Sequence, residues 1–392
     1  MKDEKMQLPD RVVYIIESLR KHGFRADAVG GAVRDLFIGR PCDDYDITTN
    51  ALPEQVESVF SSHRIIETGL KHGTVTVLVD RAAYEITTYR LDGEYLDSRH
   101  PDKVRFTDDL SEDLRRRDFT MNAICYNHID GFFDPFGGRE DIKRRLIRAV
   151  GDGERRFCED ALRILRAIRF SSVLGFDIEY NTDRALRKHA PLLKNISRER
   201  IRVELMKLLG GKYARRVLES YPDVISEAVP ALQGAILPRS FDEYGSFTRL
   251  LSLFIPYSDR AERFSAMAQE LRSDNSFRLT GTRALCAFDR PYATESDLRF
   301  MIKDYGYDVA REALLLHGIT GESISQALSS LDAIIRDGLP CKLSQLALSG
   351  DDLISLGYRG REVGQTLESL LCAVILGNAE NTRESLLSFV TK

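Results

Sequence analysis

Two short runs near the N-terminus combine residue types that could hold a triphosphate and a divalent metal. In the first run, Gly30–Asp35, paired glycines allow a sharp turn and bring backbone N–H groups close to a ligand. The pattern predicts a strand before the glycines and one or two helical turns over 32–38, so the turn opens a helix N-terminus, which favours anions. Arg34 adds a fixed positive charge whose forked donors suit phosphate oxygens.

The second run brings two carboxylates together. Asp44 and Asp46 are two residues apart, so both would point to one side if 44–48 is a strand. Two converging carboxylates and a triphosphate are typical ligands of Mg²⁺. Two such ions, about 3.5–4 Å apart, could activate an attacking 3′-hydroxyl and steady the leaving pyrophosphate. Either run alone is usually an ordinary turn, whereas the two in this order and spacing predict nucleotidyl transfer.

A polar run at 116–123 contains further candidates. Arg117, Asp118 and Asn122 could hold triphosphate and ribose. The alternative is the capped start of a helix, with Asp118 or Thr120 as the cap. The two interpretations are compatible, and the residues alone do not choose between them.

The run Glu159–Arg163 could select a base. Asp160 and Arg163 are expected on one face of a helix, three residues apart. The exocyclic amine of cytosine or adenine can donate to the carboxylate, while the neighbouring ring nitrogen accepts from the guanidinium. Uracil and guanine present the opposite pattern, and each buried mismatch costs about 1–3 kcal/mol. This pair would therefore admit CTP and ATP and reject UTP and GTP.

Simpler interpretations of the same helix stay open. Asp160 and Arg163 could form only a surface ion pair, worth about 0–1 kcal/mol. Arg166 and Arg169 follow at steps of three and would brace the pair, contact the nucleotide or merely be solvated.

The secondary-structure pattern places these runs on a mixture of strands and helices. A helix is expected over 11–21, and the β-rich segments 73–79 and 83–89 would form an antiparallel hairpin. On the second segment, Glu85 could face the aspartates as a third carboxylate, or it could form a cross-strand salt bridge.

Further along the chain the pattern changes. Residues 91–103 are polar and charged and predict a loop, and 124–133 predicts another hairpin. Strand signals nearly vanish after residue 140, and helices are expected up to 363–376 and 381–390. The sequence therefore predicts an α+β fold, with a mixed sheet and helices first and an all-α remainder.

Composition narrows the class of protein. At 392 residues the chain is long for one domain. No apolar run approaches the ~18–20 residues of a membrane span, and the N-terminus lacks the apolar core of a signal peptide, so we expect a cytoplasmic protein with no membrane contact. Six scattered cysteines without a CxxC pair suit reduced thiols. The net charge of −4 argues against a general nucleic-acid coat, but ten Lys or Arg residues between 139 and 169 favour a phosphate-rich partner.

These residues together resemble the class II tRNA nucleotidyltransferase and bacterial poly(A) polymerase family. The runs similar to its metal, ribose-contact and base-selecting motifs are, in that order, Gly30–Asp35 with Asp44–Asp46, 116–123 and Glu159–Arg163. The link Asp134–Arg139 is similar too, and the stretch 350–381 resembles the family's tRNA-facing tail more loosely. The resemblance implies Mg²⁺-dependent addition of C, C and A to tRNA 3′ ends, with CTP and ATP as substrates, release of pyrophosphate and no nucleic-acid template.

The resemblance also implies roles and partners. It puts metal on Asp44 and Asp46, with Glu85 as a third catalytic carboxylate. It puts nucleotide contacts on Gly31, Arg34, Arg117, Asp118, Asn122, Asp160, Arg163, Arg166 and Arg169. It implies that tRNA is bound at its acceptor end and elbow. It implies a nucleotidyltransferase head at 1–145, a helical neck at 146–212, a helical body at 213–320 and a tRNA-binding helical tail at 321–392.

The choice within the family depends on a few features. The loop 92–101 resembles one that CC-only enzymes lack, which favours addition of A, although His100 stands where a second arginine is expected. No Arg-Arg-Phe element follows the base-selecting run, and no long basic C-terminal extension is seen, which argues against a poly(A) polymerase. An A-adding enzyme remains an alternative. A non-catalytic tRNA-binding protein is a further alternative, which the intact carboxylates disfavour.

Overall fold

The computed structural model describes residues 6–69, 73–92 and 104–390. They form two compact units, Met1–Pro230 and Ala231–Lys392. Every strand that the structure describes belongs to the first unit, as does every candidate site residue. The described helices of both units include none that is long and apolar enough to cross a membrane.

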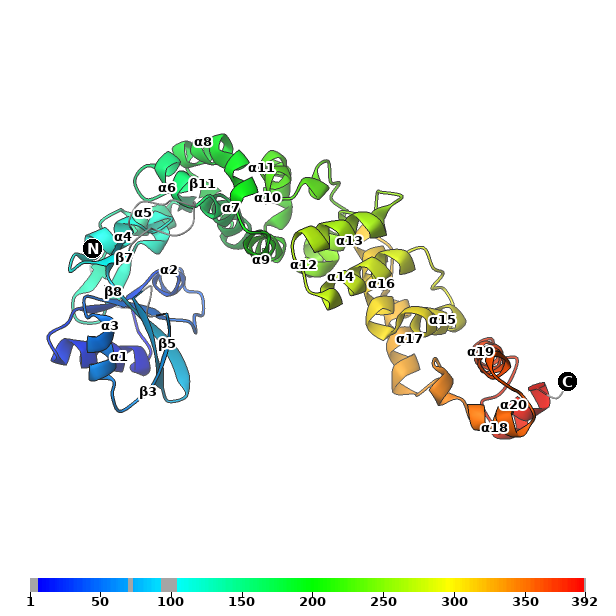
Figure 1. Cartoon of the computed structure of the whole chain (residues 1–392). Helices are drawn as coiled ribbons and strands as arrows, with labels where there is room; N and C mark the ends of the chain where they lie inside the picture. Colours follow the sequence, from blue (N-terminus) through cyan, green and yellow to red (C-terminus); the bar gives the residue numbers. More distant parts are fainter. Residues whose placement is uncertain (1–5, 70–72, 93–103, 391–392) are drawn as a thin grey trace. The chain divides into compact units, whose positions relative to one another are not determined.

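A seven-stranded mixed sheet forms the core of the N-terminal part of the first unit (Figure 1). Its strand order is β3-β4-β5-β2-β1-β8-β9. β2 and β5 run parallel, with Ile47 opposite Ile86, and the other neighbouring strands described in this sheet are antiparallel. The strands are β1 (Ala26–Val29), β2 (Asp46–Thr49), β3 (Arg64–Gly69), β4 (Thr74–Val79), β5 (Ala82–Thr88), β8 (Cys125–Asn127) and β9 (Gly131–Phe133).

Two helices pack on this sheet and position its strands. α1 (Asp10–Lys21) contacts β1, and α3 (Pro53–Val59) contacts β4 and β5. The side chains that α1 buries recur every three or four residues and so form one apolar face: Val12, Ile15, Ile16 and Leu19. The helix expected over 11–21 is thereby confirmed.

Both predicted hairpins are present. β4 and β5 pair antiparallel, with Thr76 opposite Glu85, and the turn residues Asp80 and Arg81 have φ values of 48° and 69°. Two successive positive φ values give the tight turn whose twist matches the strands of a hairpin. β8 and β9 form the second hairpin, within the segment expected at 124–133.

A third, smaller hairpin lies between β5 and β8 in the chain. β6 (Arg90–Asp92) pairs antiparallel with β7 (Val104–Phe106). The loop expected over 91–103 is wrong at its first two residues, which belong to β6, where Leu91 pairs with Arg105. Residues 93–103, which carry most of the loop that resembles the family's A-adding feature, lie outside the described residues.

The rest of the first unit is mainly helical. A short parallel pair, β10 (Leu146–Ile147) and β11 (Asp177–Ile178), interrupts it. α7 packs against α9, and α6 against α8. The helices are α2 (Gly31–Phe37), α4 (Leu110–Arg115), α5 (Gly138–Lys143), α6 (Gly153–Glu159), α7 (Leu162–Leu174), α8 (Tyr180–His189), α9 (Arg198–Leu209), α10 (Ala214–Ser220) and α11 (Pro222–Ala228).

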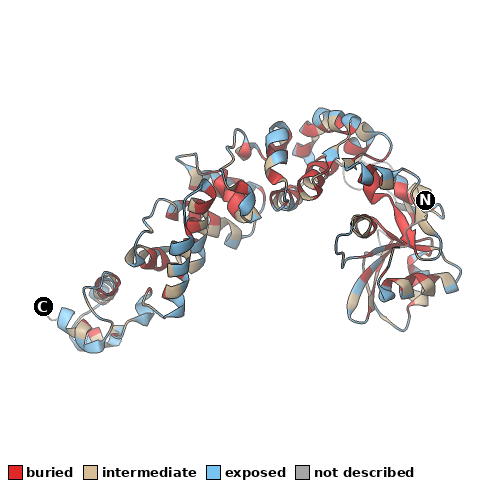
Figure 2. Ribbon diagram, turned by 180° about the vertical axis from the view of Figure 1, so that it is seen from behind, coloured by how far each residue is buried: buried red, intermediate tan, exposed pale blue. Residues whose placement is uncertain are grey.

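The second unit consists of helices in its described part, and its last three pack around a small core of their own that includes Leu353 and Leu370. Figure 2 shows buried residues on the inner faces of the helices. The helices are α12 (Ser246–Ser252), α13 (Arg260–Glu270), α14 (Asn275–Ala287), α15 (Glu295–Tyr305), α16 (Tyr307–Thr320), α17 (Ser325–Arg336), α18 (Gly350–Ser355), α19 (Arg361–Ile375) and α20 (Arg383–Val390). The α+β class is confirmed, while the divisions at residues 145, 212 and 320 stay predictions.

Candidate active site

The paired glycines form the predicted turn between β1 and α2. Gly30 has φ 76° and ψ −131°, which side chains strongly disfavour, and its N–H donates to the carbonyl of Ile124. A Cβ on Gly30 would lie 3.1 Å from Nη1 of Arg117, so the turn also packs closely against that guanidinium. Gly31 is the first residue of α2. The predicted strand, turn and helix are therefore confirmed.

The aspartates lie at the start of β2 rather than within it. The strand begins at Asp46, so the expectation that it spans 44–48 is wrong at its first two residues. The alternation nevertheless holds, because Asp44 and Asp46 are exposed while Tyr45 between them is buried. Although part of the Asp46 surface is exposed, the chain packed around its carboxyl shields it from water and raises its pKa; the charge of Arg117 lowers this pKa, and the charges of Asp44 and Glu85 raise it further. The three carboxylates are thus close enough for their charges to interact.

Glu85 reaches the aspartates through the parallel strand pair. Ile47 and Ile86 are paired, so Asp46 and Glu85 each stand one residue before a paired position. Opposite Glu85 on β4 is the uncharged Thr76. The alternative of a cross-strand salt bridge is therefore wrong, since Glu85 has no ion-pair partner among the residues that the structure describes.

Asp44 and Asp46 are the two carboxylates that we expect to hold metal here. Across the described residues, no group of three or more His, Cys, Asp or Glu side chains could hold a metal ion. Exposed carboxylates without a cationic partner of their own fit a cation that takes its other ligands from triphosphate oxygens and water. The donor set of Asp44 and Asp46 therefore suits Mg²⁺.

Arg117 faces both the glycine turn and the carboxylates. Its Nη2 lies 3.6 Å from Oδ2 of Asp113, and its side chain is 20% exposed. Its Nε is buried and has no hydrogen-bond partner in the described part of the chain. Its charge lowers the pKa of Asp46. The guanidinium is therefore placed to bind an anion between the turn and the aspartates.

Arg34 is held more tightly. Its Nη1 donates to Oδ1 of Asn122 at 2.7 Å, and its Nε and Nη2 donate to the carboxylate of Asp35 at 2.9 and 3.0 Å. The guanidinium also lies over the ring of Phe170, 5.0 Å from its centre. Arg34, which we expected to contribute its charge, is thus buried, and its bonds to Asp35 and Asn122 fix its orientation.

Asp118 is the centre of a buried polar network. Its Oδ2 accepts from Nε of Arg166 at 2.8 Å, and its Oδ1 accepts from Asn122 and from the backbone N–H of Phe119. Burial alone would raise the pKa of Asp118, but the charge of Arg166 and the hydrogen bonds outweigh it and hold the pKa at about 2. Asn122 thereby connects Asp118 to Arg34.

The helix-cap interpretation of this run is wrong. The residue before the 3₁₀ turn Thr120–Asn122 is Phe119, and no side chain caps it. Asp118 accepts from the backbone of the next residue, and the hydroxyl of Thr120 donates to Asp141 at 2.7 Å. The polar side chains of this run serve tertiary contacts instead of ending a helix.

The low pKa of Asp118 predicts a pH-dependent contribution to stability. Its ordinary pKa is 3.8, and a fall to about 2 in the folded state corresponds to about 2 kcal/mol, present at pH 7 and lost as the pH falls from about 4 to about 2. We expect Asp118→Asn to lower the free energy of unfolding by about this amount at pH 7, and the difference from the parent to shrink toward pH 3. Urea unfolding at several pH values measures it.

A control isolates the substitution itself. Asp177→Asn, at a side chain that is 78% exposed, should change the free energy of unfolding at pH 7 by less than about 0.5 kcal/mol. A difference between Asp118→Asn and the parent that stays constant from pH 7 to pH 3 would contradict the prediction.

Asp160 does not lie on the helix that carries Arg163. It ends α6 in an extended conformation, with φ −144° and ψ 100°, and its Oδ1 accepts from the backbone N–H of Leu162 at the start of α7. Its carboxylate accepts from Nη2 of Arg200 at 2.7 Å and from Nη1 at 3.3 Å. The expectation that Asp160 and Arg163 share a helix face is wrong, because the helix is interrupted between α6 and α7.

Arg163 is buried and has other partners. Its Nη1 donates to Oε2 of Glu159 at 2.8 Å and to the carbonyl of Arg156, and its Nη2 donates to the carbonyl of Arg116 at 2.9 Å. The side chain is 10% exposed. The alternative of a surface ion pair between Asp160 and Arg163 is therefore wrong. The two groups belong to adjoining but separate networks.

Arg166 and Arg169 are not merely solvated. Arg166 binds Asp118, and Arg169 lies 2.7 Å from Oε2 of Glu204 on α9 and 3.7 Å above the centre of the Phe170 ring. They fasten α7 to the polar run before it and to α9. Neither forms an ion pair with Asp160 or a described contact with Arg163.

Sequence reasoning missed the partners that orient the site: Asp35, Asp113, Glu159, Arg200 and Glu204. Two of them had a local signal. Asp113 precedes Arg116 by three residues, and Glu159 precedes Arg163 by four, which are the spacings of helical ion pairs. Arg200 is forty residues from Asp160, so no local spacing could have revealed it.

Comparison with known proteins identifies relatives. The family description "Poly A polymerase head domain" matches residues 27–148, and "Probable RNA and SrmB- binding site of polymerase A" matches residues 175–221. A CCA-adding enzyme of Lactobacillus delbrueckii subsp. bulgaricus is 39% identical over 388 residues, covering 96% of each chain.

Solved structures agree with this. The crystal structure of a Bacillus stearothermophilus CCA-adding enzyme in complex with CTP matches with a TM-score of 0.79 and 34% identity, over 98% of each chain. A Thermotoga maritima CCA-adding enzyme complexed with tRNA matches with a TM-score of 0.66 and 20% identity, over 99% of this chain and 96% of that one. The second likeness concerns the fold alone.

Proposed function

Since the chain belongs to the family of CCA-adding enzymes, we propose that it adds C, C and A to tRNA 3′ ends from CTP and ATP, with release of pyrophosphate. The observation that carries the assignment of the site is the meeting of three exposed carboxylates, Asp44, Asp46 and Glu85, with Arg117. A cluster of negative charge beside a guanidinium and a glycine turn suits a metal-bound triphosphate.

Asp44 and Asp46 would hold Mg²⁺, and Glu85 would add negative charge beside them. When bound, the metal supplies charge stabilisation at the attacking 3′-hydroxyl and at the pyrophosphate. Desolvation and the charges of Asp44 and Glu85 both raise the pKa of Asp46, and a bound cation would offset both effects. Two such ions would act together, one at the attacking hydroxyl and one at the leaving pyrophosphate.

The polar run and the glycine turn would bind the rest of the nucleotide. Arg117 and Gly31 would contact the triphosphate, with Arg34 behind them. Asp118 and Asn122 would contact the ribose, or hold Arg34 and Arg166 in place for it. The contacts Arg34–Asn122–Asp118–Arg166 support the second role, because they leave little freedom to any of the four side chains.

Asp160 and Arg163 would select the base. Each carboxylate oxygen accepts more than one hydrogen bond, so Asp160 can accept from the amine of cytosine or adenine while it holds Arg200. Arg163 would donate to the ring nitrogen from the orientation that Glu159 and two backbone carbonyls impose. Arg166 and Arg169 would act indirectly, through Asp118 and Glu204. The pattern of one acceptor and one donor rejects uracil and guanine.

The tRNA would lie along the helical part of the chain. The match of residues 175–221 to an RNA-binding description supports contact by α8, α9 and α10, with the acceptor end at the carboxylates. The tail at 321–392 would bind the tRNA elbow. A cytoplasmic location is supported by the six cysteines, all of which are free.

Three tRNA substrates test the function directly. The purified protein is given tRNAs that end before CCA, after C and after CC, each with CTP, ATP or both and with Mg²⁺, and the 3′ ends are sequenced. We expect complete CCA on the first tRNA when both nucleotides are present, and no addition when a chelator replaces Mg²⁺.

Other outcomes would identify the alternatives. Addition to the CC-ended tRNA alone would indicate an A-adding enzyme, and long runs of A would indicate a poly(A) polymerase. Binding of tRNA without any incorporation would contradict the proposal and favour a non-catalytic tRNA-binding protein.

A further inference from the structure

A buried carboxylate outside the assigned site joins several of its parts. Asp113, on α4, has a side chain with no exposed surface. Its Oδ1 accepts from Nε and Nη2 of Arg116 at 3.0 and 2.8 Å, and from the backbone N–H of Arg90 at 3.2 Å. Such a charge is tolerated away from water only when several donors surround it.

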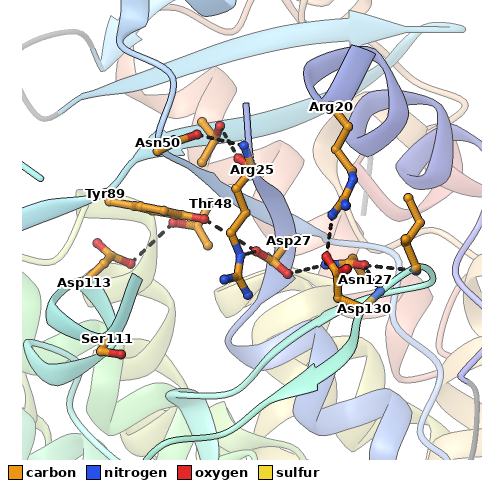
Figure 3. A network of polar contacts seen from close by, with 12 residues as sticks. Arg20, Arg25, Asp27, Thr48, Asn50, Tyr89, Ser111, Asp113, Asn127 and Asp130 are labelled. Atoms are coloured by element: carbon orange, nitrogen blue, oxygen red, sulfur yellow. Dashed lines mark hydrogen bonds and ion pairs between the residues drawn. The ribbon is translucent and has the colours of Figure 1, made fainter. Parts of the chain in front are cut away.

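The second oxygen of Asp113 faces Thr48 and Arg117. Its Oδ2 lies 3.4 Å from Oγ1 of Thr48, whose single proton is shared between this carboxylate and the carbonyl of Thr87, also at 3.4 Å, and 3.6 Å from Nη2 of Arg117. Thr48 is on β2, two residues after Asp46, and Figure 3 shows its hydroxyl directed toward Asp113. The Asp113 carboxylate thus contacts both β2, the strand that begins at Asp46, and Arg117, the arginine proposed to bind the triphosphate.

The contacts of Oδ1 extend to two further elements. Arg90 begins β6, the first strand of the hairpin that closes with β7. The carbonyl of Arg116 accepts from Nη2 of Arg163, the proposed base-selecting arginine. Asp113 thus holds the side chain of Arg116, and the backbone carbonyl of the same residue is one of three acceptors that orient Arg163.

We propose that Asp113 is a positioning residue, which directs Arg117 toward the triphosphate and, through Arg116, keeps Arg163 oriented toward the base. The inference rests on the proposed function of this site and adds the residue that connects its phosphate side to its base side. Asp113 itself touches neither the nucleotide nor the reacting atoms. It acts because its two oxygens hold two adjacent arginines and β2 at once.

The substitution Asp113→Asn tests this arrangement. Asparagine keeps the shape but loses the charge, and its amide nitrogen must face a donor, so one arginine is released. We expect the KM for CTP and for ATP to rise about tenfold, with a smaller change in kcat. We also expect more frequent incorporation of UMP, because Arg163 is less firmly oriented. The matched control is Glu112→Gln, on the same helix, whose carboxylate pairs with the exposed Arg115.

A purely structural role would give a different result. It would lower the thermal midpoint and the active fraction, and hence kcat, while KM and base selection stayed at the values of Glu112→Gln; that outcome would overturn the inference. If Asp113→Asn does not fold, Thr48→Val removes one contact of Oδ2, and a KM for CTP raised about two- to threefold supports the inference, whereas an unchanged KM contradicts it.

Direct binding of CTP separates this inference from the proposed function. If the parent protein binds CTP in calorimetry but extends no tRNA, the proposed function fails. About tenfold weaker CTP binding by Asp113→Asn would still support the positioning role in that case. Equal CTP affinity of parent and variant would refute it.

Discussion

Replacing Asp46 by asparagine should reduce CCA addition by roughly a thousandfold or more. The reason is the loss of a carboxylate expected to hold metal at the transferring phosphate, where such charge stabilisation is worth several kcal/mol and about 4 kcal/mol is a thousandfold in rate. Single-turnover incorporation of CMP into a tRNA lacking CCA measures the effect. Binding of the tRNA should change little, since its other contacts remain.

The same substitution should leave the fold as stable as before, or more stable. The pKa of Asp46 is raised in the folded state, so its ionised form at pH 7 costs folding free energy. Asparagine removes the charge, and with it the cost of desolvation and the repulsion from Asp44 and Glu85, which together outweigh the lost attraction of Arg117. A loss of activity together with an equal or higher thermal midpoint distinguishes a residue kept for function from one kept for stability.

Asp43, three residues before Asp46, offers a matched control. Asp43 is also exposed, and Asp43→Asn should retain most of the activity. Turnover by Asp46→Asn within about tenfold of the parent would contradict the metal assignment.

Replacing Asp160 by asparagine should relax the choice of base. The amide nitrogen can donate, so it can face the carbonyl of uracil, which the carboxylate repels. We expect the ratio of kcat/KM for CTP over UTP to fall about tenfold or more, because one buried mismatch is worth about 1–3 kcal/mol. Competition between CTP and UTP on one tRNA, followed by sequencing of the 3′ ends, measures this ratio.

Asp160 is a better position for this test than Arg163. Removing Arg163 would take a donor from Oε2 of Glu159 and from two backbone carbonyls, so a loss of stability would accompany the change in selectivity. Oε1 of Glu159 would keep its bonds from Arg155 and Arg156. Asp177→Asn is the matched control, since that carboxylate also contacts an arginine, Arg216, but on an exposed surface. If Asp160→Asn selects bases as its parent does, the base-selection assignment is wrong.

The local elements of the site were predictable because their signals are local. The glycine pair determines a turn that other residues adopt with strain, and Asp44 and Asp46 keep their alternation although the strand starts late. The hairpin that carries Glu85 followed from two β-rich segments with a short break. Spacing of two, three or four residues is sufficient for such features.

The pairing of charges was predicted less well. Asp160 and Arg163, expected together, bind Arg200 and Glu159 instead. The break between α6 and α7 is the cause, since a residue in an extended conformation leaves the face that helical spacing assigns to it. Asp113 has a local signal in its spacing to Arg116, but its contacts with Thr48 on β2 and with Arg90 on β6 join distant parts of the chain and had none.

The sequence by itself therefore determined which chemical groups this protein has and the short elements that present them. Only the tertiary structure decided which charge pairs with which over long separations: Asp118 with Arg166, Asp160 with Arg200, and Arg169 with Glu204. The physical reason is burial. A charge removed from water must find a partner among the groups that folding brings next to it, and those groups come mostly from distant parts of the chain.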